Sequence, residues 1–324
     1  MRVTALCGGI GGARFLLGLR ELGHDVTAIA NTGDDMTVLG LRVCPDLDSI
    51  VYTLGGGISA ERGWGRDGES FRVRDELAAY AGVVAAAEPM VPAWFGLGDL
   101  DLATHLLRTR WLADGVALST VTQWLCERWR TGLRVIPASD DWLETHVRLA
   151  DGAVIHFQEW WVRHRAQLPA SGFEVRGADS AKPAPGVIEA VADAEVVLLA
   201  PSNPVVSIGS ILEVPGIAAA LRETDATVIG LSPIIGGAPV RGMADACLAA
   251  IGVATTAGAV ARHYGCRKDG GLLDGWLVDD VDAELVEPLR ETGIECRAVP
   301  LFMHDVPATA AMARAAIDLA GTLR

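Results

Sequence analysis

Residues 1–35, MRVTALCGGIGGARFLLGLRELGHDVTAIANTGDD, decide the fold of this chain. An apolar run at 3–6 predicts a buried strand, glycines fill a turn at 8–12, and the runs at 13–22 and 26–30 predict a helix and a second strand. A glycine turn between strand and helix brings bare backbone N–H groups and the positive helix end to one place. The stretch therefore predicts a parallel α/β unit with a phosphate-binding turn.

Two acidic pairs follow this unit. The second predicted strand runs into Asp34 and Asp35, and a helix predicted at about 44–54 opens with Asp46 and Asp48. Adjacent carboxylates at a strand tip suit a divalent cation. Asp46 and Asp48 are either helix N-caps or further ligands of that cation, and the sequence leaves both interpretations open.

The alternation of strand and helix returns in the second half of the chain. Apolar runs at 195–200, 226–231, 275–278 and 295–300 predict strands that are covered on both faces. We expect one α/β domain over 1–324, with a doubly wound, mainly parallel, Rossmann-like sheet and a site at the carboxyl edge of its strands. Residues from about 110 to 180 break the alternation and predict a mostly helical insertion or lid.

Composition limits the partners. Half of the 324 residues are hydrophobic and the net charge is −14, without a basic run, so nucleic acid is not expected as a partner. No apolar run approaches a spanning helix and no signal segment is evident, which favours a cytoplasmic location away from the membrane. The six scattered cysteines lack a C-x-x-C spacing and predict buried, reduced thiols.

A dinucleotide site is the obvious alternative for the glycine turn. Gly9 and Gly11 begin the pattern G-x-G-x-x-G, but Arg14 takes the third glycine position. Asn31 stands where the second strand should end in an acidic residue for a ribose. Both departures disfavour NAD and leave a general anion-binding turn, with Arg14 in the first helical turn.

Later strand ends carry further polar tips. Ser202 and Asn203 follow one predicted strand, and Ser232 and Gly236 follow the next. Hydroxyl and amide groups of this kind can hold a base or a ribose, and no Ser-His-Asp spacing is present. Carboxylates and backbone N–H donors are thus the groups available for catalysis, and they favour metal-assisted transfer of a phosphate group.

The middle of the chain offers candidates with two readings each. Asp99 is an N-cap candidate for a long amphipathic helix, whose apolar side is predicted to carry Leu102, Leu106, Leu107 and Trp111. His105 lies in the second turn of that helix and is either a polar residue near the core or a site residue. Trp160 and Trp161 either pack in the core or stack on a planar ring.

Six runs resemble one family: 7–15, 31–35, 45–49, 98–105, 200–204 and 232–237. With residues 157–160, they are similar to the CofD-type 2-phospho-L-lactate (phosphoenolpyruvate) transferases of coenzyme F-420 biosynthesis, most of all the actinobacterial, FbiA-type form. The resemblance implies an enzyme that joins the deazaflavin alcohol FO to the phospho-three-carbon-acid unit of a guanylyl-activated donor and releases GMP. The donor is enolpyruvyl- or lactyl-diphosphoguanosine, and a homodimer is implied.

The resemblance also implies residue roles. Mg²⁺ or another divalent cation is expected at Asp34, Asp35, Asp46 and Asp48, with Asp34, Asp35 and Asp48 catalytic. Phosphate and guanosine contacts fall to Gly9, Gly11, Gly12, Arg14, Ser202, Asn203, Ser232 and Gly236. FO contacts fall to Asp99, His105, Asp140, His146 and Trp160. Relatives commonly carry Lys-Gly-Pro where this chain has Arg241, Gly242 and Met243, and a related group of nucleotide-sugar-binding regulators is the alternative function.

Overall fold

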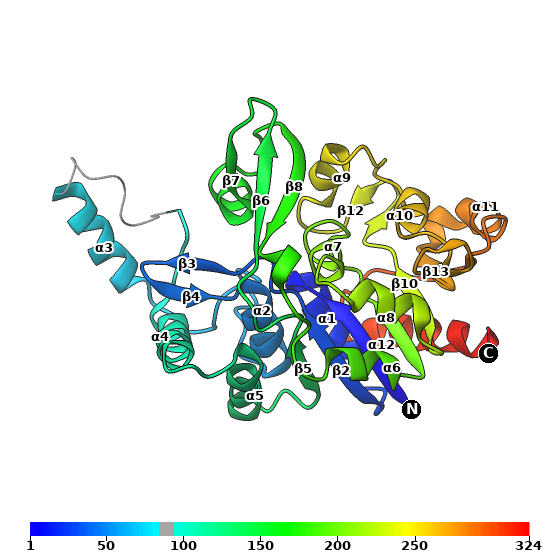
Figure 1. The fold of residues 1–324 in the computed structure, drawn as a ribbon, viewed down its shortest axis with the longest axis horizontal. Coiled ribbons are helices and arrows are strands. Elements are labelled where there is room, and N and C mark those ends of the chain that lie inside the picture. Colours follow the sequence, from blue (N-terminus) through cyan, green and yellow to red (C-terminus); the bar gives the residue numbers. More distant parts are fainter. Residues whose placement is uncertain (84–93, 324) are drawn as a thin grey trace.

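A parallel sheet forms the centre of the molecule. The computed structural model describes residues 1–83 and 94–323 (Figure 1). Within them, seven strands lie in the order β14-β13-β10-β9-β1-β2-β5, and every neighbouring pair is parallel. These strands are β1 (Arg2–Cys7), β2 (Asp25–Ala30), β5 (Arg134–Pro137), β9 (Val196–Leu199), β10 (Thr227–Leu231), β13 (Gly275–Val278) and β14 (Glu295–Ala298). The doubly wound α/β fold predicted from the sequence is confirmed.

Helices cover both faces of this sheet. Alternate residues of β1 explain why, since Val3, Ala5 and Cys7 lie in one apolar core and Leu6 lies in the other. The first core is closed by α1 (Gly9–Arg20), α2 (Pro45–Leu54), α5 (Leu118–Trp129) and α12 (Val306–Thr322). The second is closed by α6 (Val187–Ala192), α7 (Ile208–Leu212), α8 (Ile217–Glu223), α9 (Ala244–Ala250), α10 (Ala257–Tyr264) and α11 (Val286–Arg290).

The strand order reverses between β1 and β9. From β1 the chain moves outward to β2 and β5, then returns to β9 on the other side of β1 and continues to β10, β13 and β14. In open parallel sheets, ligands bind in the crevice at the carboxyl ends of the strands that flank such a switch point. The glycine turn after β1 and the polar tip after β9 therefore meet at the expected position.

The middle of the chain differs from the prediction of a mostly helical insertion. It contains an antiparallel sheet of β6 (Glu144–Leu149), β7 (Val154–His156) and β8 (Ala170–Arg176). A π-helix, η1 (Glu159–Arg163), lies between β7 and β8 in the chain. Figure 1 shows this sheet projecting from the body between α9 and the hairpin of β3 (Met36–Val38) and β4 (Leu41–Val43). In addition, β5 pairs with β2 as the edge strand of the central sheet. Short strands are harder to recognise than helices because a few cross-strand partners, distant in sequence, decide them.

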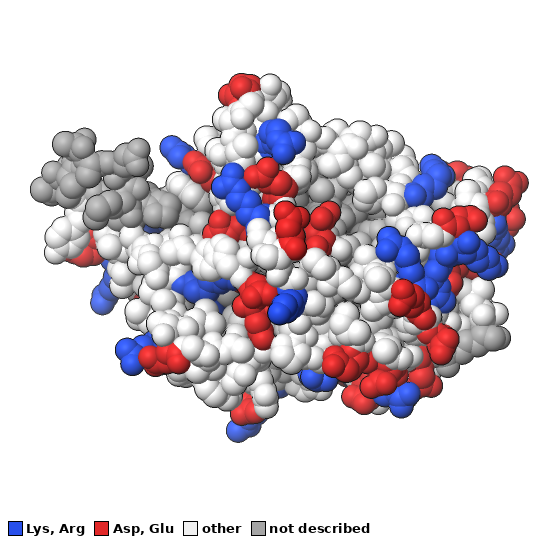
Figure 2. Space-filling model, viewed as in Figure 1, with Lys and Arg blue, Asp and Glu red and all other residues white. Residues whose placement is uncertain are grey.

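The remaining elements lie around the carboxyl edge or at the surface. They are β3 (Met36–Val38), β4 (Leu41–Val43), α3 (Arg72–Val83), α4 (Asp99–Ala113), β11 (Ile234–Ile235), β12 (Ala238–Pro239) and the 3₁₀ turns η2 (Ala178–Ser180), η3 (Arg267–Asp269) and η4 (Asp280–Leu285). On the face in Figure 2, basic and acidic side chains lie interspersed among uncharged surface. No helix among the described residues is long and apolar enough to cross a membrane.

Helix α4 is oriented opposite to its predicted polarity. Leu106 and Leu107, expected to face the core, are 57% and 50% exposed. The buried side instead carries Asp101, Thr104, His105 and Arg108, at the i, i+3, i+4 and i+7 spacing of one helix face. The polar side is buried because it forms ion pairs and hydrogen bonds with α2. The predicted apolar side was wrong for Leu106 and Leu107, whereas Leu102 and Trp111 pack, partly buried, against apolar clusters.

Candidate functional site

A cavity of about 740 Å³ lies at the carboxyl edge of the sheet. Its walls come from the loops after β1, β9, β10 and β14, from α2 and α4, from η1, and from the residues near 64 and 95. Of the predicted site residues, it is lined by Gly9, Gly11, Arg14, Asp34, Asp46, Asp48, His105, Ser202, Asn203 and Ser232. The structure thus brings together residues from six separate segments of the chain.

The glycine turn presents the start of α1 to this cavity. The N-cap residue is Gly8, which has no side chain to cap the helix. Gly8 N–H donates to Ser202 Oγ (3.1 Å), and the Ser202 hydroxyl donates back to Gly8 O (2.9 Å). A Cβ at Gly11 would lie 2.8 Å from Pro201 O, so only glycine allows the β1 and β9 loops to approach this closely. The Gly9 N–H at the start of α1 is hydrogen-bonded to the Asp46 carboxyl group, so Asp46 lies at the N-terminus of this helix.

The polar tips of the later loops hold their own backbone. Asn203 Oδ1 accepts from Val205 N–H (2.9 Å), and Ser232 Oγ accepts from Ile234 N–H (3.1 Å). Both side chains therefore shape loops that line the cavity. Gly12 and Gly236 do not line it, and Gly236 N–H donates to Asp282 Oδ2 (2.9 Å), which ties its loop to η4.

Asp34 and Asp46 form an acidic pair in the cavity wall. Asn31 Nδ2 donates to Asp34 Oδ1 (3.2 Å) and to Asp46 Oδ2 (2.9 Å), and Gln158 Nε2 donates to Asp34 Oδ2 (3.0 Å). Burial first, and then the Asp46 charge, raise the pKa of Asp34 well above its usual value. Burial likewise raises the pKa of Asp46 to about 6. No arginine, lysine or histidine of the described residues forms an ion pair with either carboxyl group.

Asp35 and Asp48, in contrast, are paired with arginines. Arg42 Nη2 lies 2.8 Å from Asp35 Oδ2, and Asp35 does not line the cavity, although burial still raises its pKa to about 6. Arg108 holds both carboxylate oxygens of Asp48, with Nη1 3.0 Å from Oδ2 and Nη2 in contact with Oδ1. The four aspartates expected to surround one metal therefore divide into a free pair, Asp34 and Asp46, and two ion-paired residues.

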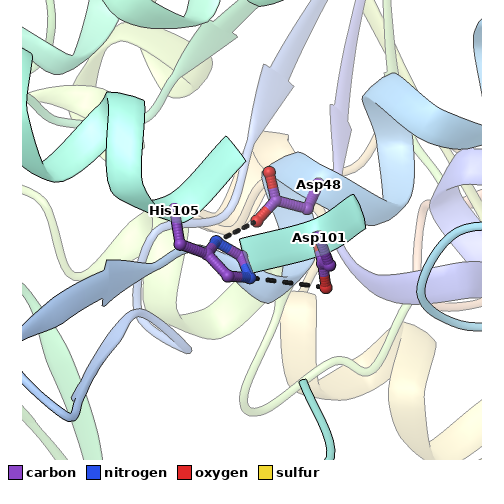
Figure 3. A group of neighbouring side chains, drawn as sticks. All are labelled: Asp48, Asp101 and His105. Atoms are coloured by element: carbon purple, nitrogen blue, oxygen red, sulfur yellow. Dashed lines mark ion pairs between the residues drawn. The ribbon is translucent and has the colours of Figure 1, made fainter. Parts of the chain in front are cut away.

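The buried face of α4 adds a second polar group. His105 lies between Asp48 and Asp101 in Figure 3, with Nδ1 3.7 Å from Asp48 Oδ2 and Nε2 3.3 Å from Asp101 Oδ2. The three side chains offer ligand atoms within 4.8 Å of one another, an arrangement that could hold a metal ion. Burial raises the pKa of Asp101, but the adjacent His105, the Tyr52 hydroxyl and the Arg108 charge outweigh it and hold this pKa below its usual value.

Four of the five residues predicted for FO lie off the cavity. Asp99 is exposed and accepts from Ser70 N–H, and Asp140 accepts from Ser119 at the start of α5. His146 is buried in β6. Trp160 is 1% exposed, and its Nε1–H donates to Leu168 O (2.8 Å) in the core under η1. Of this set, only His105 lines the cavity.

Several lining residues were not identified from the sequence. They include Tyr52, Trp64, Asp101, Gln158 and Arg165. Arg165 follows the π-helix with φ +52°, and Ala166 next to it has φ +54°. Consecutive non-glycine residues in this region are strained and cluster at ligand sites. The run WWVRHR at 160–165 was a usable signal, because it combines aromatic and basic residues beside Gln158.

An open parallel sheet with a glycine turn and an acidic pair at its switch point defines an α/β protein of the class that binds ligands at the carboxyl ends of its strands. Comparison with known proteins agrees with this class and identifies the family. The family described as 2-phospho-L-lactate transferase CofD matches residues 3–315. The chain belongs to the CofD family and is a transferase of that type.

Relatives match over their full length. A Streptomyces griseus protein named phosphoenolpyruvate transferase is 57% identical, covering 100% of both chains. A Thermobifida fusca protein of the same name is 57% identical, covering 100% of this chain and 99% of its own. A solved structure from Bacillus halodurans, described as a member of the upf0052 family, superposes with a TM-score of 0.62 at 17% identity over 97% of this chain and 99% of its own. This last likeness concerns the fold alone.

Proposed function

We propose that this chain transfers a phospho-three-carbon-acid unit from a guanosine-diphosphate-type donor to FO, forming a coenzyme F-420 precursor and GMP. The observation that carries the proposal is the charge arrangement of the cavity. The glycine-rich start of α1 and exposed arginines face the same space as two carboxyl groups that lack a cationic partner among the described residues. Anionic phosphates with a divalent cation complement this arrangement.

The donor's phosphates are assigned to the α1 end of the cavity. Gly9, Ile10 and Gly11 begin α1 there, and Arg14 lies one turn further along the helix. Arg165 lines the cavity from the turn after η1, and Arg241 lines it from the loop after β12. Guanidinium groups bind phosphate and carboxylate through paired hydrogen bonds, so these arginines suit the diphosphate and the acid group of the donor. The relatives from Streptomyces griseus and Thermobifida fusca are named phosphoenolpyruvate transferase, which favours an enolpyruvyl unit in the donor.

The residues fit a divalent cation at Asp34 and Asp46. Mg²⁺ prefers oxygen ligands, and both carboxyl groups carry raised pKa values because each is buried near other acidic charge. A bound Mg²⁺ supplies positive charge that neutralises the diphosphate and favours its cleavage. Asp35 and Asp48 are less suitable ligands, since their carboxylates are already neutralised by Arg42 and Arg108.

The transfer itself is a displacement at phosphorus. The terminal hydroxyl oxygen of FO forms a bond to the phosphorus that bears the three-carbon acid. The bond from that phosphorus to the bridging oxygen breaks, and GMP leaves with the electron pair. The hydroxyl proton passes to a carboxylate lining the cavity, Asp34, Asp46 or Asp48. Asp35 is excluded from this role because it does not line the cavity.

Aromatic side chains supply a wall for the flat deazaflavin. Trp161 lines the cavity beside Arg165, and Trp64 lines it from the loop before α3. Stacking of planar rings stabilises contacts of this type by roughly 0.5–1.5 kcal/mol beyond the buried area. We therefore assign the deazaflavin to Trp161, in place of its buried neighbour Trp160.

The adjacent tryptophans give a matched pair of variants. Trp161→Ala is expected to raise the KM for FO about tenfold and to lower stability less than Trp160→Ala does, because Trp161 is only partly buried where it packs against Phe157. Trp160→Ala is expected to cost about 3–5 kcal/mol of stability, because it empties a buried site packed against Phe157 and Phe173. Steady-state kinetics and denaturant unfolding measure both. Equal behaviour of the two variants contradicts the assignment.

The function is tested by incubating the protein with FO, Mg²⁺ and either the enolpyruvyl or the lactyl guanosine diphosphate compound. Mass spectrometry is expected to detect the phosphodiester product and GMP in equal amounts, and the faster donor identifies the three-carbon unit. Tight binding of a nucleotide-sugar by calorimetry, with no product from either donor, would overturn the proposal in favour of the regulator alternative.

A homodimer accompanies this proposal. Leu106 and Leu107 of α4 are exposed, and Trp124 of α5 is 39% exposed and contacts Trp111 of α4. An exposed apolar surface on neighbouring helices supports self-association. Light scattering of the purified protein is expected to give about twice the chain mass, and a monomer at micromolar concentration contradicts it.

A further inference from the structure

Gln158 holds one oxygen of Asp34 from outside the central sheet. It lies between β7 and η1, is 7% exposed and lines the cavity, and its Nε2–H donates to Asp34 Oδ2 (3.0 Å). An ionised carboxylate can only accept, so the amide nitrogen of Gln158 must face it. The antiparallel sheet of β6, β7 and β8, called the small sheet below, therefore contributes a contact to the acidic pair of the cavity.

The other amide at this carboxyl group, that of Asn31, is shared between acceptors. Asn31 Nδ2 lies within hydrogen-bond distance of Asp34 Oδ1 (3.2 Å), Asp46 Oδ2 (2.9 Å) and Val206 O (3.1 Å). An amide nitrogen carries two hydrogens and cannot donate fully to three acceptors. The contact to Asp34 is the longest of the three, so Gln158 gives Asp34 its shorter hydrogen bond.

His156 fixes the segment that carries Gln158. Gln158 N–H donates to His156 Nδ1 (3.0 Å), so the ring proton resides on Nε2. His156 Nε2–H then donates to Asp35 O (3.2 Å). On β6, Thr145 N–H donates to Gly33 O (2.6 Å). Together with the Gln158 side chain, these contacts tie the small sheet to the loop after β2 at three points, and they define where the Gln158 amide reaches.

The hydrogen bonds of Asp34 leave lone pairs for a cation. An ionised carboxylate has about four lone-pair positions, and the two amides occupy one on each oxygen. Neither amide is charged, so neither neutralises the carboxylate. Hydrogen bonds of this kind orient metal-binding carboxylates, and their loss typically weakens metal affinity about 10- to 100-fold.

We infer that Gln158 is a positioning residue for the divalent cation and acts through Asp34, whose carboxyl group it holds in one orientation. This inference rests on the proposed function, in which Asp34 and Asp46 bind that cation. It gives the small sheet a part in the metal site, because the sheet's contacts with the loop after β2 place the Gln158 amide. The turn that carries Gln158 also carries Trp161, so one segment serves both the cation and the proposed deazaflavin wall.

Binding of Mn²⁺ alone, followed by electron paramagnetic resonance of the free ion, tests this inference without turnover. Gln158→Met keeps the length of the side chain and removes the donor, so the Kd for Mn²⁺ is expected to rise about 10- to 100-fold. In an Asp34→Asn background the same substitution should change the Kd less than about twofold, because its effect requires the carboxylate. Glu159→Gln, at the next position and outside the cavity, is the control and should leave the Kd unchanged.

Gln158→Asn provides a second variant. It keeps the amide but is one methylene too short to reach Asp34, so it should weaken Mn²⁺ binding as Gln158→Met does. Thermal unfolding midpoints check that each variant is folded. Wild-type affinity in both Gln158 variants, or equal losses from Gln158→Met with and without Asp34→Asn, overturns the inference alone. Wild-type protein that binds no Mn²⁺ refutes the cation site of the proposed function, and the inference with it.

Discussion

Asp34→Asn is expected to reduce turnover by about 10³-fold while the protein stays folded. The substitution removes a negative charge from the cavity wall, and loss of a preorganised charge in a transition state costs on the order of 10²–10³ in rate. The fold is expected to be retained because the new amide oxygen still accepts from Asn31 Nδ2–H, because Gln158 can turn its own amide to accept from the new NH₂ group, and because the repulsion with Asp46 disappears. The thermal midpoint should remain within about 2 °C of wild type.

The control for Asp34→Asn is the same substitution at an exposed aspartate outside the cavity. Asp114 pairs with Arg110 on the exposed side of α4, and Asp114→Asn is expected to leave turnover and stability unchanged. The Mg²⁺ concentration for half-maximal activity should rise in Asp34→Asn and not in Asp114→Asn. A wild-type rate in Asp34→Asn would remove Asp34 from both the metal site and the chemistry.

Arg108→Met is expected to lower stability by about 3–5 kcal/mol, since it leaves the buried Asp48 carboxylate without its partner. The double variant Arg108→Met, Asp48→Leu should recover most of this loss, because two apolar side chains can replace a buried ion pair. Activity should not return in the double variant, since Asp48 lines the cavity. Denaturant unfolding with turnover assays on the three proteins measures this.

Arg110→Met provides a control on the same helix. Arg110 is 73% exposed at its side chain, and its ion pair is expected to contribute less than about 1 kcal/mol. An unfolding midpoint of Arg108→Met equal to that of Arg110→Met contradicts the structural role of the buried pair.

The sequence predicted the sheet and the site edge because both follow from local patterns. Apolar strands, glycine turns and polar strand tips are adjacent along the chain, and parallel strands bring their carboxyl ends to one edge. The polarity of α4 could not be obtained in this way. Leucine spacing predicts an apolar face, whereas the buried face is decided by Asp48 on α2, which pairs with Arg108 sixty residues away.

In two pairs of adjacent identical residues, one member lines the cavity and the other does not. Asp34 lines the cavity and Asp35 pairs with Arg42, and likewise Trp161 lines the cavity while Trp160 is buried. Adjacent side chains point in different directions in any backbone conformation, so a pair in the sequence supplies one cavity residue and one structural residue. Only the three-dimensional arrangement tells which is which.

The central claim is that the terminal hydroxyl of FO displaces GMP at the phosphorus bearing the three-carbon acid. FO labelled with ¹⁸O at that hydroxyl tests it directly, by mass spectrometry of both products. The account predicts that the phosphodiester product retains the label completely and that GMP contains none. A product without the label, or FO joined to the guanylyl group, would contradict it.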